Sequence, residues 1–161
     1  AYVSKIQGAT QNGADWYNYF IESRKIPIDR VRLVANDNGD KETIEKELHK
    51  APEAAEPGGT LWFVFIGHGA PLKFDDKFEG VLIGQDAKQT ADSLAARSVR
   101  QSQVSKLMGA SKASHKVAVL DACFSGKSAA GSLAPGLQPT LVVSSAAVIG
   151  AVTWLSAGAG G

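Results

Sequence analysis

Two reactive side chains in this sequence each stand at the end of a short apolar run. His68 follows the run at residues 61–66 and has a glycine on either side, and Cys123 closes the run that starts at residue 117. A thiol and an imidazole together suit nucleophilic catalysis, because the imidazole can take the thiol proton and later protonate a leaving amine. The pair therefore predicts Cys123 as a nucleophile and His68 as its general base and acid.

The runs before these residues indicate how they are positioned. Short stretches rich in Val, Phe, Ile and Leu that stop at glycine are typical of strands buried on both faces of a sheet. Open α/β sheets place their sites just beyond the carboxyl ends of such strands. The glycines beside His68 let a substrate backbone approach closely. The N–H groups of Gly69 and Cys123 are the expected donors to a developing oxyanion.

Each residue also has an ordinary structural interpretation when taken alone. His68 can be a turn residue, and a lone cysteine is by default a small buried hydrophobic residue. The catalytic interpretation depends on both residues standing at strand ends in glycine-rich context. The other two histidines are weaker candidates for a catalytic role. His49 lies on the charged part of a predicted helix, and His115 lies in a predicted turn among Lys and Ser. We expect both of these to be solvated.

The remaining chain predicts helices that alternate with strands. Trp16 and Phe20, four residues apart, predict a helix over residues 9–23. Asp40 is the expected N-cap of a second helix that runs to Ala51. Ser98 and Gln101 form a capping-box pattern at the start of a third. The predicted strands are residues 31–34, 60–66, 117–123, 140–144 and 152–156, and residues 81–83 are expected to be a small hairpin or an edge strand. The predicted loops are 52–59, 70–80 and 125–138.

This alternation predicts an α/β fold with a mostly parallel sheet covered by helices on both faces, that is, a three-layer α-β-α sandwich. A chain of 161 residues is long enough to bury a substantial core, and we expect a single domain over residues 1–161.

Composition excludes some function classes and leaves the compartment open. The net charge is +1, from 17 Lys and Arg against 16 Asp and Glu, and no basic stripe predicts nucleic-acid binding. No apolar run approaches the roughly 20 residues that span a bilayer, so no membrane partner is expected. The single cysteine excludes an intrachain disulfide, which favours a reducing compartment such as the cytoplasm without establishing it.

The two motifs carry a family resemblance. Gly67-His68-Gly69 after a buried strand, followed by Asp121-Ala-Cys-Phe-Ser-Gly126, resembles the His-Gly and Asp-x-Cys-x-Ser-Gly signatures of caspase-like cysteine peptidases. The match is closer to metacaspases and bacterial caspase homologues than to animal caspases. The separation of 123 − 68 = 55 residues is near the roughly 50 of a caspase-type His-to-Cys spacing.

The resemblance implies a caspase–haemoglobinase fold and a cysteine endopeptidase that uses a Cys123–His68 dyad, with Gly69 and Cys123 forming the oxyanion hole. Asp121 matches the acidic residue at the base of the primary specificity pocket in metacaspases. A carboxylate there requires a guanidinium or ammonium partner, so cleavage after Arg or Lys of protein or peptide substrates is implied. The alternative for Asp121 is a structural carboxylate that binds nearby backbone amides.

The chain departs from the family pattern in three places. The first core strand, which precedes the Gly8-Ala9 region in the family, is missing, and so is the small-subunit segment expected after Gly161. Asn12 stands near a position where metacaspases often carry a second pocket Asp. The resemblance therefore implies a large-subunit portion whose partner is the small-subunit segment of the same precursor, with activation by proteolytic processing in the loop after Cys123.

Three further possibilities concern ligands and function. Some metacaspases need calcium, but the acidic residues that could suggest a site lack calcium-loop spacing, so no metal or cofactor is predicted; these are Asp75, Asp76, Glu79 and Asp86. Residues 125–128 end like a phosphate-binding loop, although Asp121 stands where that motif requires glycine. A non-catalytic caspase-like scaffold that binds partners is the alternative outside enzymes.

Overall fold

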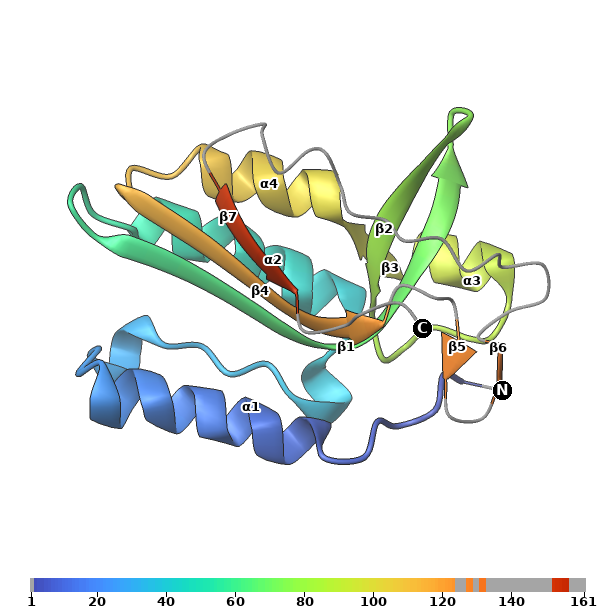
Figure 1. Ribbon diagram of the computed structural model, residues 1–161, viewed down its shortest axis with the longest axis horizontal. Helices are drawn as coiled ribbons and strands as arrows, with labels where there is room; N and C mark the ends of the chain where they lie inside the picture. The colour runs from blue at the N-terminus through green and yellow to red at the C-terminus, as the bar shows by residue number, and fades with distance from the viewer. Residues whose placement is uncertain (1, 124–126, 129–130, 133–151, 157–161) are drawn as a thin grey trace.

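The computed structural model describes residues 2–123, 127–128, 131–132 and 152–156. Its centre is a five-stranded sheet in the order β3-β2-β1-β4-β7 (Figure 1). The strands are β1 (Thr60–Phe74), β2 (Lys77–Ile83), β3 (Ser98–Arg100), β4 (His115–Cys123) and β7 (Val152–Ser156). A separate two-stranded pair consists of β5 (Lys127–Ser128) and β6 (Gly131–Ser132).

β1 is the strand around which the sheet is built. Residues 60–68 pair in parallel with β4, and residues 69–74 pair antiparallel with β2 on the opposite edge. β4 continues the parallel part to β7, whereas β2 continues the antiparallel part to β3. The switch of partners falls at His68 and Gly69, so the candidate histidine stands where the two halves of the sheet meet.

The helices are α1 (Ala9–Asn18), α2 (Lys41–Ala54), α3 (Ala91–Ala96) and α4 (Gln101–Gly109). α2 and α4 cover one face of the parallel strands and bury the main core there (Figure 1). Leu48 from α2 and Met108 from α4 pack with Leu61 of β1 and Leu120 of β4. Odd-numbered residues of β1 face this core, because side chains alternate along a strand.

The other face of β1 carries α1 and a second small core. A π-helical turn, Tyr19–Ser23, continues α1, and its Phe20 ring lies 5.6 Å from the Trp62 ring between their centroids. Further along the sheet, Ala70, Leu72, Val81 and Leu94 form a separate buried cluster with Val3 packed against it. The amino-terminal segment is thereby attached to the antiparallel half of the sheet.

Several sequence predictions are confirmed. The helix predicted over residues 9–23 forms as α1 and its π-helical turn. The Asp40 carboxylate caps α2 by accepting a 2.8 Å hydrogen bond from the Thr43 N–H. The strands predicted at residues 60–66, 117–123 and 152–156 are present as β1, β4 and β7. The α/β class is therefore correct.

Other predictions are wrong. The polar loop predicted at 70–80 is a hairpin, since β1 runs on to Phe74 and β2 begins at Lys77. Asp75 and Asp76 adopt positive φ angles of 46° and 65°, which a two-residue hairpin turn requires. The sheet is consequently mixed rather than mostly parallel, with two parallel and two antiparallel strand pairs.

Three local predictions also fail. Residues 31–34, predicted as a strand, pair with none of the strands that the structure describes. The capping box at Ser98 does not form, because Ser98 begins β3 and α4 starts at Gln101. α2 continues through Pro52 to Ala54 instead of ending before it, and α3 was not predicted. The predicted strand at 140–144 and most of the loop predicted at 125–138 lie outside the described residues.

Candidate functional site

The structure brings the backbones of the two reactive residues together. β1 and β4 pair in parallel with Thr60 opposite His115, and the register ends with His68 opposite Cys123. Adjacent strands lie about 4.8 Å apart, so the two residues stand one strand spacing from each other at the carboxyl end of the parallel ladder. Residues 55 apart in sequence are therefore neighbours.

The His68 ring has one observed polar partner, the backbone carbonyl of Ser4. The distance from Nε2 to the Ser4 oxygen is 2.7 Å, and the ring is partly buried. A carbonyl oxygen can only accept a hydrogen bond, so Nε2 must carry the proton. In the neutral imidazole this leaves Nδ1 with a free lone pair. The contact therefore selects the tautomer in which Nδ1 is the basic atom.

The segment that supplies this carbonyl is attached to the protein by the two residues just before Ser4. Val3 donates from its backbone N–H to the Ala87 carbonyl oxygen at 3.0 Å and packs against the cluster around Leu72. Tyr2 forms a β-bridge with Lys88. The sequence could not have indicated Ser4, because a backbone carbonyl is present at every residue and only the fold selects one.

Asp121 lies on β4 opposite Ile66 of β1, two residues along the register from the His68–Cys123 pair. The alternation of side chains puts Asp121 on the same face of the sheet as Ile66 and His68, the face away from α2 and α4. Asp121 is half-buried. No Lys or Arg of the described residues lies within ion-pair distance of its carboxylate.

Gly69 is buried and stands opposite Leu82 of β2, at the first position of the antiparallel ladder. Its role as an oxyanion donor stays a prediction. The exposure of His49 and His115 agrees with the expectation that both are solvated.

The acidic residues that could suggest calcium are separated by the fold. Asp75 and Asp76 stand at the hairpin tip, where Asp76 pairs with Lys73 at 2.7 Å. Glu79 accepts a hydrogen bond from the Ser102 N–H at 2.8 Å. Asp86 pairs with Arg97 at 3.2 Å. Among the described residues, no group of three or more His, Cys, Asp or Glu side chains could hold a metal ion.

The phosphate-loop alternative loses support from local structure. That motif needs a glycine-rich loop that opens into a helix. Lys127 and Ser128 instead form the short strand β5, paired with β6, while residues 125 and 126 lie outside the described part.

Within the described ranges, no helix is long and apolar enough to cross a bilayer.

Comparison with known proteins adds no assignment. No protein-family model matches the chain, and no curated protein has a significantly similar sequence.

Proposed function

We propose that this chain is the catalytic portion of a caspase-like cysteine endopeptidase, with the three-layer sandwich of that fold. The observation that carries the proposal is the parallel register that puts His68 opposite Cys123 at the ends of β1 and β4. The hydrogen bond from His68 Nε2 to Ser4 supports the assignment of roles, because it leaves Nδ1 as the base.

In the proposed reaction, His68 Nδ1 takes the proton of the Cys123 thiol. The thiolate attacks the carbonyl carbon of the scissile peptide bond, and the negative charge moves to the carbonyl oxygen, which the Gly69 and Cys123 N–H groups stabilise. When the tetrahedral intermediate collapses, the C–N bond breaks and the imidazolium gives its proton to the leaving amine. Water, deprotonated by the same imidazole, then hydrolyses the thioester and restores the thiol.

The Ser4 carbonyl acts as a positioning group in this scheme. It fixes the orientation of the ring and stabilises the imidazolium that forms, since Nε2–H donates to it in both protonation states. It takes the place that a carboxylate holds in a Ser-His-Asp triad, without adding a negative charge.

We also propose that substrates have Arg or Lys before the cleaved bond. The support is the half-buried carboxylate of Asp121, which lies on the His68 face of the sheet and has no cationic partner among the described residues. A substrate guanidinium would provide the missing counter-charge through a charge-assisted, bidentate hydrogen bond.

The direct test measures hydrolysis of fluorogenic peptides that end in Arg, Lys or Asp, with Cys123→Ala as the control. We expect turnover of the Arg and Lys peptides that the control lacks. Because Cys123 is the only cysteine, the rate of alkylation by iodoacetamide at pH 6 reports its thiolate directly. An ordinary, slow thiol together with no turnover of any peptide would contradict the peptidase proposal.

A further inference from the structure

The segment that supplies the carbonyl partner of His68 is buried at only two of its residues. Residues 5–8, which lead from Ser4 into α1, are all exposed, and Tyr2 is 63% exposed. Only Val3 and Ser4 of residues 2–8 are partly buried. The contacts that hold the Ser4 carbonyl in place therefore lie mainly on the side of Val3.

Val3 contacts the protein through both its backbone and its side chain. Its N–H donates to the Ala87 carbonyl oxygen at 3.0 Å. Its side chain packs against the buried cluster that contains Leu72 and Leu94. Ala87 belongs to that cluster and has no exposed surface. Since Ser4 follows directly in the chain, Val3 connects its carbonyl to an apolar core.

The loop that receives Val3 is itself held by the main body of the fold. We call residues 84–88 the anchor loop. The Gln85 N–H donates to the Gly39 carbonyl oxygen at 2.9 Å, just before α2 begins. The Asp86 carboxylate accepts a hydrogen bond from the Lys41 N–H, the first of α2, at 3.3 Å. The anchor loop is thus attached to the start of α2 and offers Val3 a fixed position.

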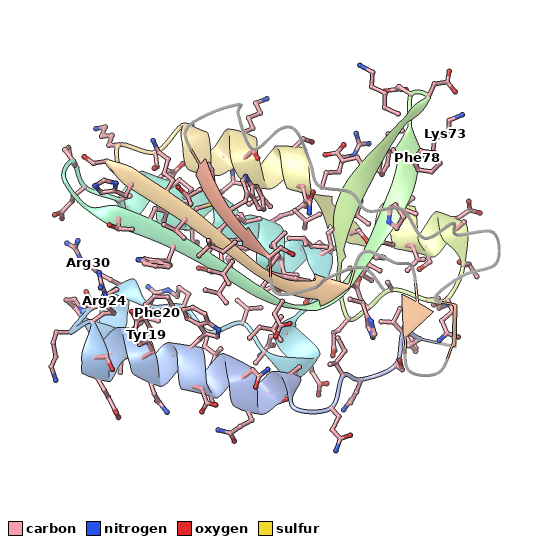
Figure 2. All side chains as sticks on the ribbon, in the orientation of Figure 1. Tyr19, Phe20, Arg24, Arg30, Lys73 and Phe78 are labelled. Atoms are coloured by element: carbon pink, nitrogen blue, oxygen red, sulfur yellow. The ribbon has the colours of Figure 1, made fainter. Side chains whose placement is uncertain are left out.

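The cluster under Val3 lies at the base of the hairpin that β1 and β2 form. Towards the tip the hairpin is open to solvent: Phe78 is 55% exposed, and Figure 2 shows it with Lys73 on the projecting arm. At the base, Ala70 belongs to the buried cluster and stands two residues after His68 on β1. The histidine and the cluster that receives Val3 therefore share one strand.

We propose that Val3 is a positioning residue for the reaction and acts on the His68 ring through the Ser4 carbonyl. This inference rests on the proposed function. Docking of Val3 on the anchor loop keeps the Ser4 oxygen at 2.7 Å from Nε2. When Val3 leaves the cluster, the ring loses the acceptor that fixes its orientation, and Nδ1 is no longer held in one place as the base.

The test is a graded series of substitutions at Val3. Val3→Ile keeps an apolar, β-branched side chain, Val3→Thr places a hydroxyl against the cluster, and Val3→Asp places a charge there. Gln7→Asp is the matched control, because it introduces the same charge into the same segment at an exposed position. Circular dichroism identifies the variants that are folded, and Val3→Thr decides the question where Val3→Asp does not fold.

The first readout is the hydrolysis of Arg peptides. We expect Val3→Asp to lower kcat by about 10- to 100-fold with KM unchanged, the usual cost of losing a group that orients a functional histidine. Val3→Thr should lower kcat less. Val3→Ile and Gln7→Asp should retain the wild-type kcat.

The second readout is the proton NMR signal of the His68 Nε2–H, which the hydrogen bond to Ser4 protects from exchange with water. The signal is identified by its loss in His68→Ala. We expect it to weaken from wild type to Val3→Thr to Val3→Asp, in the same order as kcat, and to persist in Gln7→Asp.

An unchanged kcat and Nε2–H signal in folded Val3→Asp would overturn the proposal, and so would an equal loss in Gln7→Asp. A lower unfolding midpoint without any change in the Nε2–H signal would assign Val3 to stability alone and would also overturn it. A wild-type protein without peptide turnover would contradict the proposed function instead, whereas the NMR signal tests the action of Val3 on His68 independently of turnover.

Discussion

His68 and Cys123 are register partners on neighbouring parallel strands. Each stands on an element of the central sheet, and β1 and β4 share the most extensive strand contact of the described fold. A site built on such strands keeps its backbone geometry better than one carried on loops. The Ser4 carbonyl then sets which ring nitrogen of His68 is free. The sheet thus positions the residues, and the amino-terminal segment selects the tautomer.

Replacing the histidine tests its role as base. We expect His68→Ala to lower kcat by roughly 100- to 10,000-fold, the usual range for removal of a general base. It should also slow alkylation of Cys123 at pH 6, because the thiol loses the base that accepts its proton and less thiolate forms. Matched controls are His49→Ala and His115→Ala, both at exposed positions, which should leave the two rates unchanged. A loss of similar size in either control would argue against a specific role for His68.

Removing the charge of Asp121 tests substrate choice separately from chemistry. We expect Asp121→Asn to lower kcat/KM for Arg and Lys peptides by roughly 10- to 150-fold, which corresponds to the loss of a charge-assisted contact of about 1.5–3 kcal/mol. Alkylation of Cys123 should proceed at the wild-type rate. Asp92→Asn, at an exposed position on α3, is the control. An unchanged preference for basic peptides would assign Asp121 to structure alone.

The cap of α2 predicts a dependence of stability on pH. The Thr43 N–H lowers the pKa of the Asp40 carboxyl below its usual value. A carboxyl with a lowered folded pKa stabilises the fold above its unfolded pKa of about 3.9, and this contribution is lost as the pH falls through the lower folded value. We expect Asp40→Ala to reduce the free energy of unfolding by about 0.5–2 kcal/mol at pH 7.

The measurement is urea unfolding of both proteins at pH 7 and pH 3. The difference between wild type and Asp40→Ala should shrink at the lower pH. A difference that is the same at both values would mean that the charge of Asp40 contributes nothing to the cap.

Two glycines predict opposite effects of the same substitution. A Cβ added at Gly84 would lie 2.8 Å from the Lys41 nitrogen and 2.9 Å from the Arg97 oxygen, both backbone atoms that cannot move aside alone. We expect Gly84→Ala to destabilise the protein by about 1–3 kcal/mol. Gly13, inside α1, has only the Leu33 side chain nearby, at 3.7 Å. Gly13→Ala should stabilise by up to about 1 kcal/mol. Thermal unfolding of both variants gives the comparison, and a stable Gly84→Ala would show that the backbone can yield there.

Local chemistry in the sequence was sufficient for several elements. The apolar runs before His68 and Cys123 predicted β1 and β4, because short runs rich in Val, Phe, Ile and Leu are typical of sheet strands. Asp40 predicted the start of α2, since its carboxylate can bond an amide three residues on. The same kind of local pattern predicted the two reactive residues and their positions at strand ends.

The tertiary structure decided what depends on distant partners. Residues 31–34 carry a strand-like pattern, but a strand needs a paired neighbour, and none of the described strands pairs with them. The sequence did not predict the hairpin at 74–77, because Asp75-Asp76 has the composition of a polar loop. Only the structure shows that both residues adopt the positive φ of a tight turn. The register between His68 and Cys123, and the choice of the Ser4 carbonyl as partner of the ring, depend on pairings across 55 and 64 residues. A local pattern contains no information on pairings at such separations.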